Sequence, residues 1–275
     1  MKKIMGAVLM GVIILTAAGM AVSHAAQVSG TIQIVGSTTI QPLAEELAQA
    51  YMAKHKNVKI FVQGGGSGAG VKAALTGTAD IGTCSRELEP TETGITATVI
   101  AKDGIAIIVN KSNPVPNLTI AQVQKIFSGS VANWKQVGGP NLPIVVVNRE
   151  AGSGTRTAFE ELVLKPAKLT NTSNCLVQAS TGAVNQTVAI TKEAIGYSSL
   201  ADLDPSLNLK DVMVNGVKAT VANILARKYP LQRPLLMLTK TAPTGAVKAF
   251  LAWIASPEGQ NLVLKYHFIS INEKK

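Results

Sequence analysis

Charged residues make up only 15% of this 275-residue chain, and aromatic residues only 4%. With so few aromatic rings there is little on which nucleic-acid bases could stack. The basic residues are scattered, and no run of four forms a continuous basic track. The sequence therefore argues against nucleic acid as a partner, although the formal net charge is +10. That charge is either a solvated basic surface or an aid to the capture of small anions.

Residues that bind metals or form disulfides are also scarce. The chain has two cysteines, Cys84 and Cys175, and three histidines, His24, His55 and His267. Two cysteines cannot supply a four-ligand zinc site, and the histidines show no ligand spacing. We therefore expect no metal and no cofactor. In an exported protein the two cysteines could pair, and the sequence does not decide whether they do.

Long apolar runs are absent except at the N-terminus. Lys2 and Lys3 precede residues 4–22, which are apolar or small and uncharged, and Ser23-His24-Ala25 follows with small residues at the cleavage-type positions. This layout predicts a secretory signal peptide over residues 1–25. A membrane anchor is the alternative, but no stop-transfer charges follow the run. We expect a periplasmic, monomeric mature chain with a formal charge of +8, which is the +10 of the precursor less the two lysines.

The rest of the sequence alternates strand and helix patterns. Strands are predicted over residues 31–36, 58–62, 80–86, 104–110 and 144–147, and a break at Tyr229-Pro230 and Arg233-Pro234 precedes residues 235–238. Helical periodicity is found over residues 43–51, 71–75, 119–127, 158–164, 247–254 and 260–266. This alternation predicts an α/β protein built on open sheets with helices on both faces.

Four loops, each following a predicted strand, share a composition of small and hydroxyl residues, and two of them contain arginine. They are residues 37–39, 66–68, 83–86 and 149–156. A helix that follows such a loop offers free backbone N–H groups and the positive end of its dipole. Serine and threonine add hydroxyl donors, and arginine adds a forked cation suited to oxyanions. One such loop would be an ordinary helix cap, but four together predict an oxyanion site at the carboxyl ends of the strands.

Two catalytic motifs are approached but not completed. Residues 65–70 have the first half of a P-loop spacing, but Val71 stands where the lysine should follow, and Lys72 comes one place late. Gly152-Ser153-Gly154 lacks the full nucleophile elbow, because Ala151 occupies its first glycine position. We therefore expect no enzymatic activity. A secreted phosphatase or esterase that uses Ser153 or Ser67 is the alternative from another class.

In combination these segments resemble PstS-type phosphate-binding proteins of ABC importers. Residues 63–72 (QGGGSGAGVK) are similar to the family's second loop, and residues 149–155 (REAGSGT) match its arginine-to-Ser-Gly-Thr signature in spacing. Residues 36–39 with Pro42 look like the first loop, and residues 80–88 look like the third loop of shorter members. Segments 194–197, 229–231 and 256–260 also fit, so that the resemblance covers nearly the whole mature chain.

The resemblance implies a type II periplasmic-binding-protein fold, in which two α/β lobes are joined by two crossovers and close on an anion. Each lobe is expected to be an open sheet flanked by helices. Residues 26–101 and 229–275 are expected to form the first lobe, and residues 102–228 the second. The family's ligands fall on Thr38, Thr39, Ser67, Ser85, Arg149, Ser153, Gly154 and Thr155, and Ser37 and Arg86 are adjacent candidates on chemical grounds. The implied function is the capture of inorganic phosphate and its delivery to the membrane permease of an ABC importer, while a sensor or adhesion role stays open.

The sequence departs from the long members of the family at Ser85, where they have an aspartate. A carboxylate there accepts the proton of hydrogen phosphate and repels sulfate, which has no proton to donate. The Ser85 hydroxyl can still accept a hydrogen bond, but it does not carry the repulsive charge. Another tetrahedral oxyanion, such as sulfate, arsenate or molybdate, is therefore the alternative ligand.

Overall fold

The computed structural model describes residues 28–273. The predicted signal peptide, residues 1–25, lies outside the described residues. The elements follow in the order β1 (Gly30–Gly36), α1 (Gln41–Lys54), β2 (Val58–Gln63), α2 (Ser67–Thr76), β3 (Ile81–Cys84), β4 (Thr96–Asn110), β5 (Asn117–Leu118), α3 (Ile120–Phe127), β6 (Val145–Arg149), α4 (Gly154–Phe159), β7 (Leu176–Gln178), α5 (Thr181–Ile190), β8 (Ala194–Ser199), β9 (Leu209–Val214), α6 (Val221–Leu225), β10 (Gln232–Thr239), α7 (Gly245–Ala255), α8 (Pro257–Lys265) and β11 (Ile269–Ser270). Short 3-10 helices lie at Trp134–Val137 and Lys165–Ala167, and a π-helix at Glu160–Leu164.

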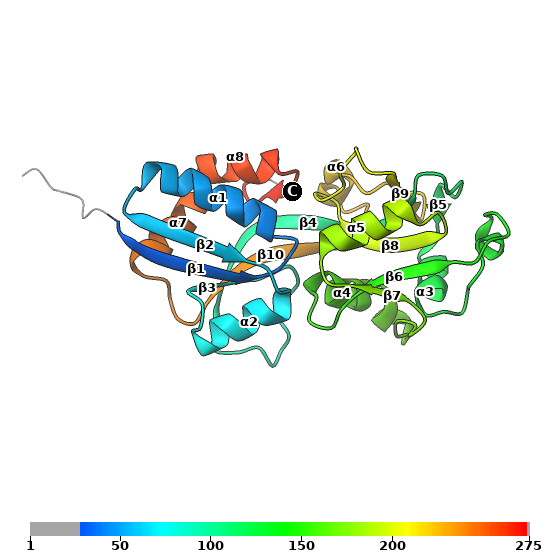
Figure 1. Cartoon of the computed structure of the whole chain (residues 1–275), viewed down its shortest axis with the longest axis horizontal. Coiled ribbons are helices and arrows are strands. Elements are labelled where there is room, and N and C mark those ends of the chain that lie inside the picture. Colours follow the sequence, from blue (N-terminus) through cyan, green and yellow to red (C-terminus); the bar gives the residue numbers. More distant parts are fainter. Residues whose placement is uncertain (1–27, 274–275) are drawn as a thin grey trace, which may run out of the picture.

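Two lobes lie side by side, and strand β4 runs from one into the other (Figure 1). The first part of β4 pairs with β10 and β11, whereas its last residues pair with β8 and β9. The chain returns to the first lobe through the segment that leads into β10. These two connections are the crossovers of a two-lobed periplasmic-binding-protein fold, as predicted.

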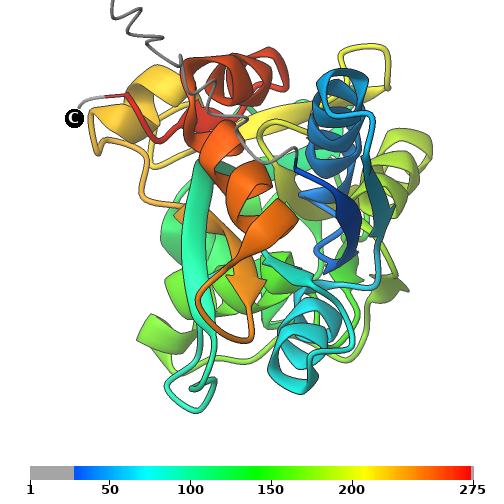
Figure 2. The same cartoon turned by 90° about the vertical axis from the view of Figure 1, so that its left-hand side faces the viewer.

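The first lobe is built on strands in the order β2-β1-β3-β10-β4. Strands β1, β2 and β3 are parallel, and β10 joins them antiparallel. Helices α1, α7 and α8 cover one face of this sheet and α2 covers the other (Figures 1 and 2). The main core between the sheet and the three helices includes Ile32, Leu47, Tyr51, Met237 and Phe250, all at most 1% exposed.

The second lobe continues the strand order through β4-β8-β6-β7, with β9 beside β4 and β5 beside β9. Helix α5 packs on β8, β4 and β6, and α4 lies on the opposite face (Figure 1). The core contains a stack of aromatic rings in which Phe159 lies 4.3 Å from Tyr197 and 4.6 Å from Phe127, between centroids. The chain passes from the first core into the second within β4, between Ala101 and Ile105. It returns to the first core between Leu231 and Leu235.

Most predicted elements are present, but several begin at different residues. The strand predicted from residue 104 is the second part of β4, which starts at Thr96, because residues 96–99 are mostly exposed and lack the apolar pattern of the rest. The helix predicted from residue 71 begins at Ser67. The helix predicted over 158–164 begins at Gly154, and its last residues are π-helical. Both glycine-rich segments are thus first helical turns, which brings Ser67 and Gly154 to helix starts.

Helix α1 does not begin with a serine or threonine cap. Its N-cap residue is Ile40, which makes no side-chain cap hydrogen bond. The Ser37 hydroxyl instead accepts from the backbone N–H groups of Thr39 and Ile40, at 3.2 and 3.3 Å. Ser37 therefore shapes the turn before the helix rather than capping it. Among the described residues, no helix combines the length and the apolar character that a membrane span requires.

Candidate anion-binding site

A small, tightly closed cavity lies where the two lobes meet, and hydroxyl groups and an arginine line it. Nine of the ten residues predicted from the sequence line this cavity, and Gly66 is a further lining residue. The lining residues are Ser37, Thr38, Thr39, Gly66, Ser67, Ser85, Arg149, Ser153, Gly154 and Thr155. They come from both lobes, so the cavity is complete only when the lobes are in contact.

The topology explains why residues so far apart in sequence converge. Strands β1, β2 and β3 run parallel in the first lobe, and the loops that follow them leave at one edge of the sheet. Strand β6 of the second lobe ends at Arg149 and leads into α4. The carboxyl ends of parallel strands are where open α/β sheets bind their ligands. The lobes touch here through a backbone hydrogen bond of 2.9 Å from Gly68 N–H to the Gly152 carbonyl.

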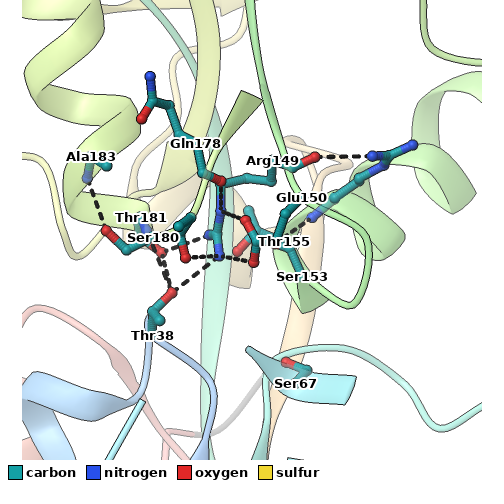
Figure 3. A network of polar contacts seen from close by, with 12 residues as sticks. Thr38, Ser67, Arg149, Glu150, Ser153, Thr155, Gln178, Ser180, Thr181 and Ala183 are labelled. Atoms are coloured by element: carbon teal, nitrogen blue, oxygen red, sulfur yellow. Dashed lines mark hydrogen bonds and ion pairs between the residues drawn. The ribbon is translucent and has the colours of Figure 1, made fainter. Parts of the chain in front are cut away.

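Arg149 is the central cation of the site, and it is 2% exposed. Its Nε donates to Glu150 Oε2 at 3.0 Å and to the Gln178 carbonyl at 3.1 Å, and its Nη2 donates to Glu150 Oε1 at 2.9 Å. The same guanidinium donates to the hydroxyls of Thr181 and Thr38, each at 3.2 Å (Figure 3). Glu150 and Gln178 therefore fix the orientation of a charge that faces hydroxyls of both lobes.

Arg86, the second arginine predicted for the site, does not line the cavity. Its Nη1 and Nη2 atoms donate to the two carboxylate oxygens of Glu92 at 2.7 and 2.6 Å. Glu92 raises the pKa of Arg86 against the opposing effect of burial. Burial alone would raise the pKa of Glu92, but the hydrogen bonds from Arg86 lower it. This bidentate pair holds the segment after β3 in place, and the guanidinium is not free to bind an anion.

The second arginine of the cluster is Arg233 on β10, which the sequence reading missed. It is 4% exposed, and its Nη1 donates to Thr155 Oγ1 at 2.7 Å and to Ser85 Oγ at 3.3 Å. Its Nη2 donates to Thr39 Oγ1 at 3.3 Å. Asp103 holds the guanidinium with bonds of 2.8 and 3.0 Å. Burial raises the pKa of the Asp103 carboxyl, and Arg233 opposes that rise.

Thr181, at the start of α5, was also missed. Its Oγ1 lies 3.1 Å from Thr39 Oγ1 and accepts from Arg149. A signal for it was present in the sequence, because Ser180-Thr181-Gly182 opens a helix with the composition of the other loops. Arg233 had no such signal, since it lies within a strand and is followed by a proline.

Two glycines allow the loops to approach closely. Gly66 has φ +86°, a conformation that other residues rarely adopt, and it precedes the first turn of α2. Gly154 of the second lobe faces the first lobe so closely that a Cβ atom there would lie 2.8 Å from both Ser67 Cβ and Ser85 Oγ. A side chain at position 154 would therefore keep the lobes apart.

The groups around the cavity are suited to binding rather than to catalysis. Eight hydroxyls and two guanidinium groups surround it, and the two nearby carboxylates, Glu150 and Asp103, are each bound to an arginine. The lining residues include no histidine, cysteine or carboxylate that could act as a general base. Within residues 28–273 no cluster of three metal-ligating side chains occurs. Such a set of donors fits an oxyanion with several negatively charged oxygens.

The crossovers, the cleft and the donor-lined cavity define a two-lobed solute-binding protein. A family model described as a PBP superfamily domain matches residues 21–258. The chain is 30% identical over 253 residues to the phosphate-binding protein PstS of Bacillus subtilis (strain 168), covering 90% of this chain and 83% of that protein. The chain belongs to the PstS family of the periplasmic-binding-protein superfamily.

Solved structures agree with this placement. A putative phosphate ABC transporter substrate-binding protein with bound phosphate from Clostridium perfringens superimposes with a TM-score of 0.84 at 40% identity, covering 88% of this chain and 100% of that chain. An ABC-type phosphate transport receptor from Vibrio cholerae gives a TM-score of 0.73 at 34% identity, covering 86% and 99%.

Proposed function

We propose that this protein captures inorganic phosphate between its two lobes and delivers it to an ABC importer. The observation that carries the proposal is the buried Arg149 guanidinium, which donates to hydroxyls of both lobes at 3.2 Å. A phosphate oxygen that takes the place of these contacts would receive charge-assisted hydrogen bonds in a desolvated site. Relatives named as phosphate-binding proteins, one of them with bound phosphate, support the same ligand.

The binding set of this proposal comprises the lining residues together with two residues outside the original prediction. It consists of Ser37, Thr38, Thr39, Ser67, Ser85, Arg149, Ser153, Gly154 and Thr155, with Arg233 and Thr181 added. In this proposal the described part of the first lobe comprises residues 28–101 and 232–273, and the second lobe residues 102–231, because Leu231 packs in the second core and Leu235 in the first. The protein acts as a receptor without enzymatic turnover, because its cavity offers donors and no base.

Transport requires export and a membrane partner. The predicted signal peptide supports a periplasmic mature chain that begins at Ala26, acts as a monomer and presents its closed form to a permease. N-terminal sequencing of the periplasmic protein tests the cleavage site. Uptake of labelled phosphate by the source cells, compared with an isogenic strain that lacks this chain, tests delivery. Binding in solution with unchanged uptake would point to a sensor role instead.

Calorimetric titration of the ligand-stripped mature protein with phosphate tests capture directly. We expect one binding event per chain. The matched control is Arg149→Ala, which should bind far more weakly, and the absence of binding to the unaltered protein would refute the proposal. Release of phosphate from a generic phosphomonoester would instead identify a hydrolase.

A further inference from the structure

The hydroxyl groups around the cavity share one feature, which is that each accepts a hydrogen bond from an N–H group of the protein. Backbone N–H groups of Ser85 and Arg156 donate to Ser67 Oγ and Ser153 Oγ at 3.0 and 3.3 Å. The Ser37 hydroxyl accepts from the two backbone N–H groups described above. The two arginines supply the others: Arg149 donates to the hydroxyls of Thr38 and Thr181, and Arg233 to those of Thr39, Ser85 and Thr155.

This arrangement fixes which hydrogen-bonding role, donor or acceptor, each hydroxyl takes toward a ligand. An N–H group can only donate, so each of these hydroxyl oxygens must use a lone pair to accept. The hydroxyl's own proton is then available for another acceptor. Toward an anion that displaces the contacts between neighbouring hydroxyls, such as Thr39–Thr155 and Ser67–Ser85, each hydroxyl can therefore act as a donor.

The two nearby carboxylates, Glu150 and Asp103, do not offer an acceptor to a ligand in the cavity. Both oxygens of Glu150 accept from Arg149, at 3.0 and 2.9 Å. Asp103 accepts from Arg233 through Oδ2 and from the Ser199 hydroxyl through Oδ1 at 2.9 Å. Neither carboxylate lines the cavity. The negative charge that could repel a fully deprotonated anion is thus paired with an arginine.

From this geometry we propose that Arg233, held by Asp103, is a positioning residue that orients the hydroxyls of Thr39, Ser85 and Thr155 as donors toward the ligand. The site therefore selects tetrahedral oxyanions by charge and shape. It does not distinguish an anion that carries a proton from one that does not, so that sulfate competes with phosphate. The inference rests on the proposed function, because it concerns the same cavity. Hydrogen phosphate is still bound, because its unprotonated oxygens accept from the same donors as those of sulfate.

Titration of the ligand-stripped mature protein with phosphate, with sulfate, and with phosphate in excess sulfate tests the inference. We expect the dissociation constants of the two anions to lie within about tenfold, the worth of one ordinary hydrogen bond. Tight phosphate binding that excess sulfate leaves unchanged would overturn the inference but keep the proposed function. Binding of neither anion would remove both.

Ser85→Asp gives a second test, because it places a carboxylate beside Arg233 at the cavity wall. We expect sulfate to bind at least about 100-fold more weakly than to the unaltered protein, since Arg233 can hold only one oxygen of the new carboxylate, and the other, facing the cavity, strongly rejects a ligand that has no proton to donate. Phosphate should change by less than about tenfold. Ser85→Asn is the matched control with similar size and no charge, and an equal loss of sulfate in both variants would contradict the inference.

The role of Arg233 itself is tested by exchanging both members of its ion pair. The double variant Arg233→Gln with Asp103→Asn leaves no buried charge without a partner. We expect both anions to bind about 100-fold more weakly, because a charge-assisted network is lost, while circular dichroism shows a folded protein. Affinity equal to that of the unaltered protein would show that Arg233 does not act on the site. If this variant does not fold, the competition experiment and Ser85→Asp still decide the inference.

Discussion

Thr39 and Thr155 belong to different lobes, yet their Oγ1 atoms lie 3.2 Å apart and both accept hydrogen bonds from Arg233. Arg233 lies on β10, where the chain re-enters the first lobe, and it is paired with Asp103 on the other crossover strand. The contact that completes the site is therefore anchored at the hinge between the lobes. A ligand that bridges the two threonines would favour the closed arrangement, because only that arrangement provides both sets of donors.

Replacing Arg149 should distinguish the ligand-binding arginine from a structural one. Arg149→Ala removes the charge that faces Thr38 and Thr181, and we expect phosphate affinity to fall by about 100-fold or more, since hydrogen bonds to charged groups each contribute about 1.5–3 kcal/mol. This loss should exceed that of any single serine-to-alanine change in the site. Calorimetry measures both.

Arg86→Ala is the matched control. It removes the bidentate pair with Glu92 and should lower the thermal unfolding midpoint without a comparable loss of affinity. Equal losses of affinity in the two variants would contradict the assignment of Arg86 to a structural role.

Gly154→Ala should hold the lobes apart. The added Cβ would meet Ser67 Cβ and Ser85 Oγ at 2.8 Å, closer than side chains pack. We expect phosphate affinity to fall by about tenfold or more, because overpacking a tight contact costs about 1–3 kcal/mol. Gly182→Ala is the control, since a Cβ there meets no atom within 4 Å. Unchanged affinity in Gly154→Ala would show that the lobes need not approach this closely.

Part of the site could be predicted because its chemistry is local in sequence. Ser67 and Ser153 lie in short glycine-containing segments that follow a strand and open a helix, and that context is visible without a structure. Arg86 was predicted for the site because its neighbourhood looks the same, whereas its partner in the structure, Glu92, is set by the fold of the following loop. Arg233 could not be found, because its role depends on strand pairing with a segment 130 residues away.

The fold was predictable to a similar extent. Alternating strands and helices indicated an open α/β architecture, and the resemblance supplied two lobes. The long strand β4 was only half recognised, since its first residues are exposed and belong to one sheet while its last residues are buried in the other. A strand shared between two sheets has no sequence pattern of its own.

Thr181 should contribute to binding although no motif marked it. Thr181→Val removes the hydroxyl that accepts from Arg149 Nη1 and lies 3.1 Å from Thr39 Oγ1. We expect affinity to fall about 5- to 150-fold, because a buried donor is left without its partner at a cost of about 1–3 kcal/mol. The control is Thr187→Val in the same helix, whose hydroxyl donates to the Ala183 carbonyl and should be replaceable. Similar affinities for the two variants would remove Thr181 from the site.

The two cysteines should remain unpaired in the exported protein. Cys84 is fully buried in the first lobe, in a cluster with Val71 and Leu236, whereas Cys175 packs against the core of the second lobe. Burial raises the pKa of the Cys84 thiol, which lowers its reactivity. We expect thiol titration of the unfolded, unreduced protein to find both thiols, and Cys84 to be unreactive in the native state. Finding no thiol after unfolding would demonstrate a disulfide.

Asp202 should make the folded protein less stable as the pH rises, whereas a salt-bridged carboxylate makes a protein more stable as the pH rises. Burial, with a further contribution from Asp103, raises the pKa of Asp202 well above its usual value, and its Oδ2 atom is buried without a hydrogen-bond partner. The native state therefore binds the proton more tightly than the unfolded chain does. Between the two pKa values the native state holds more protons, so this group lowers stability as the pH rises.

Asp202→Asn removes that ionisation while keeping the shape of the side chain. We expect its thermal midpoint to exceed that of the unaltered protein at pH 8 by about 2–4 °C for each kcal/mol regained, and the difference to shrink at pH 5. Asp204→Asn is the control, because hydrogen bonds from Ser206 lower the pKa of this exposed carboxyl and its loss should give no gain. A midpoint difference for Asp202→Asn that stays constant from pH 5 to pH 8 would mean that Asp202 ionises normally in the folded protein.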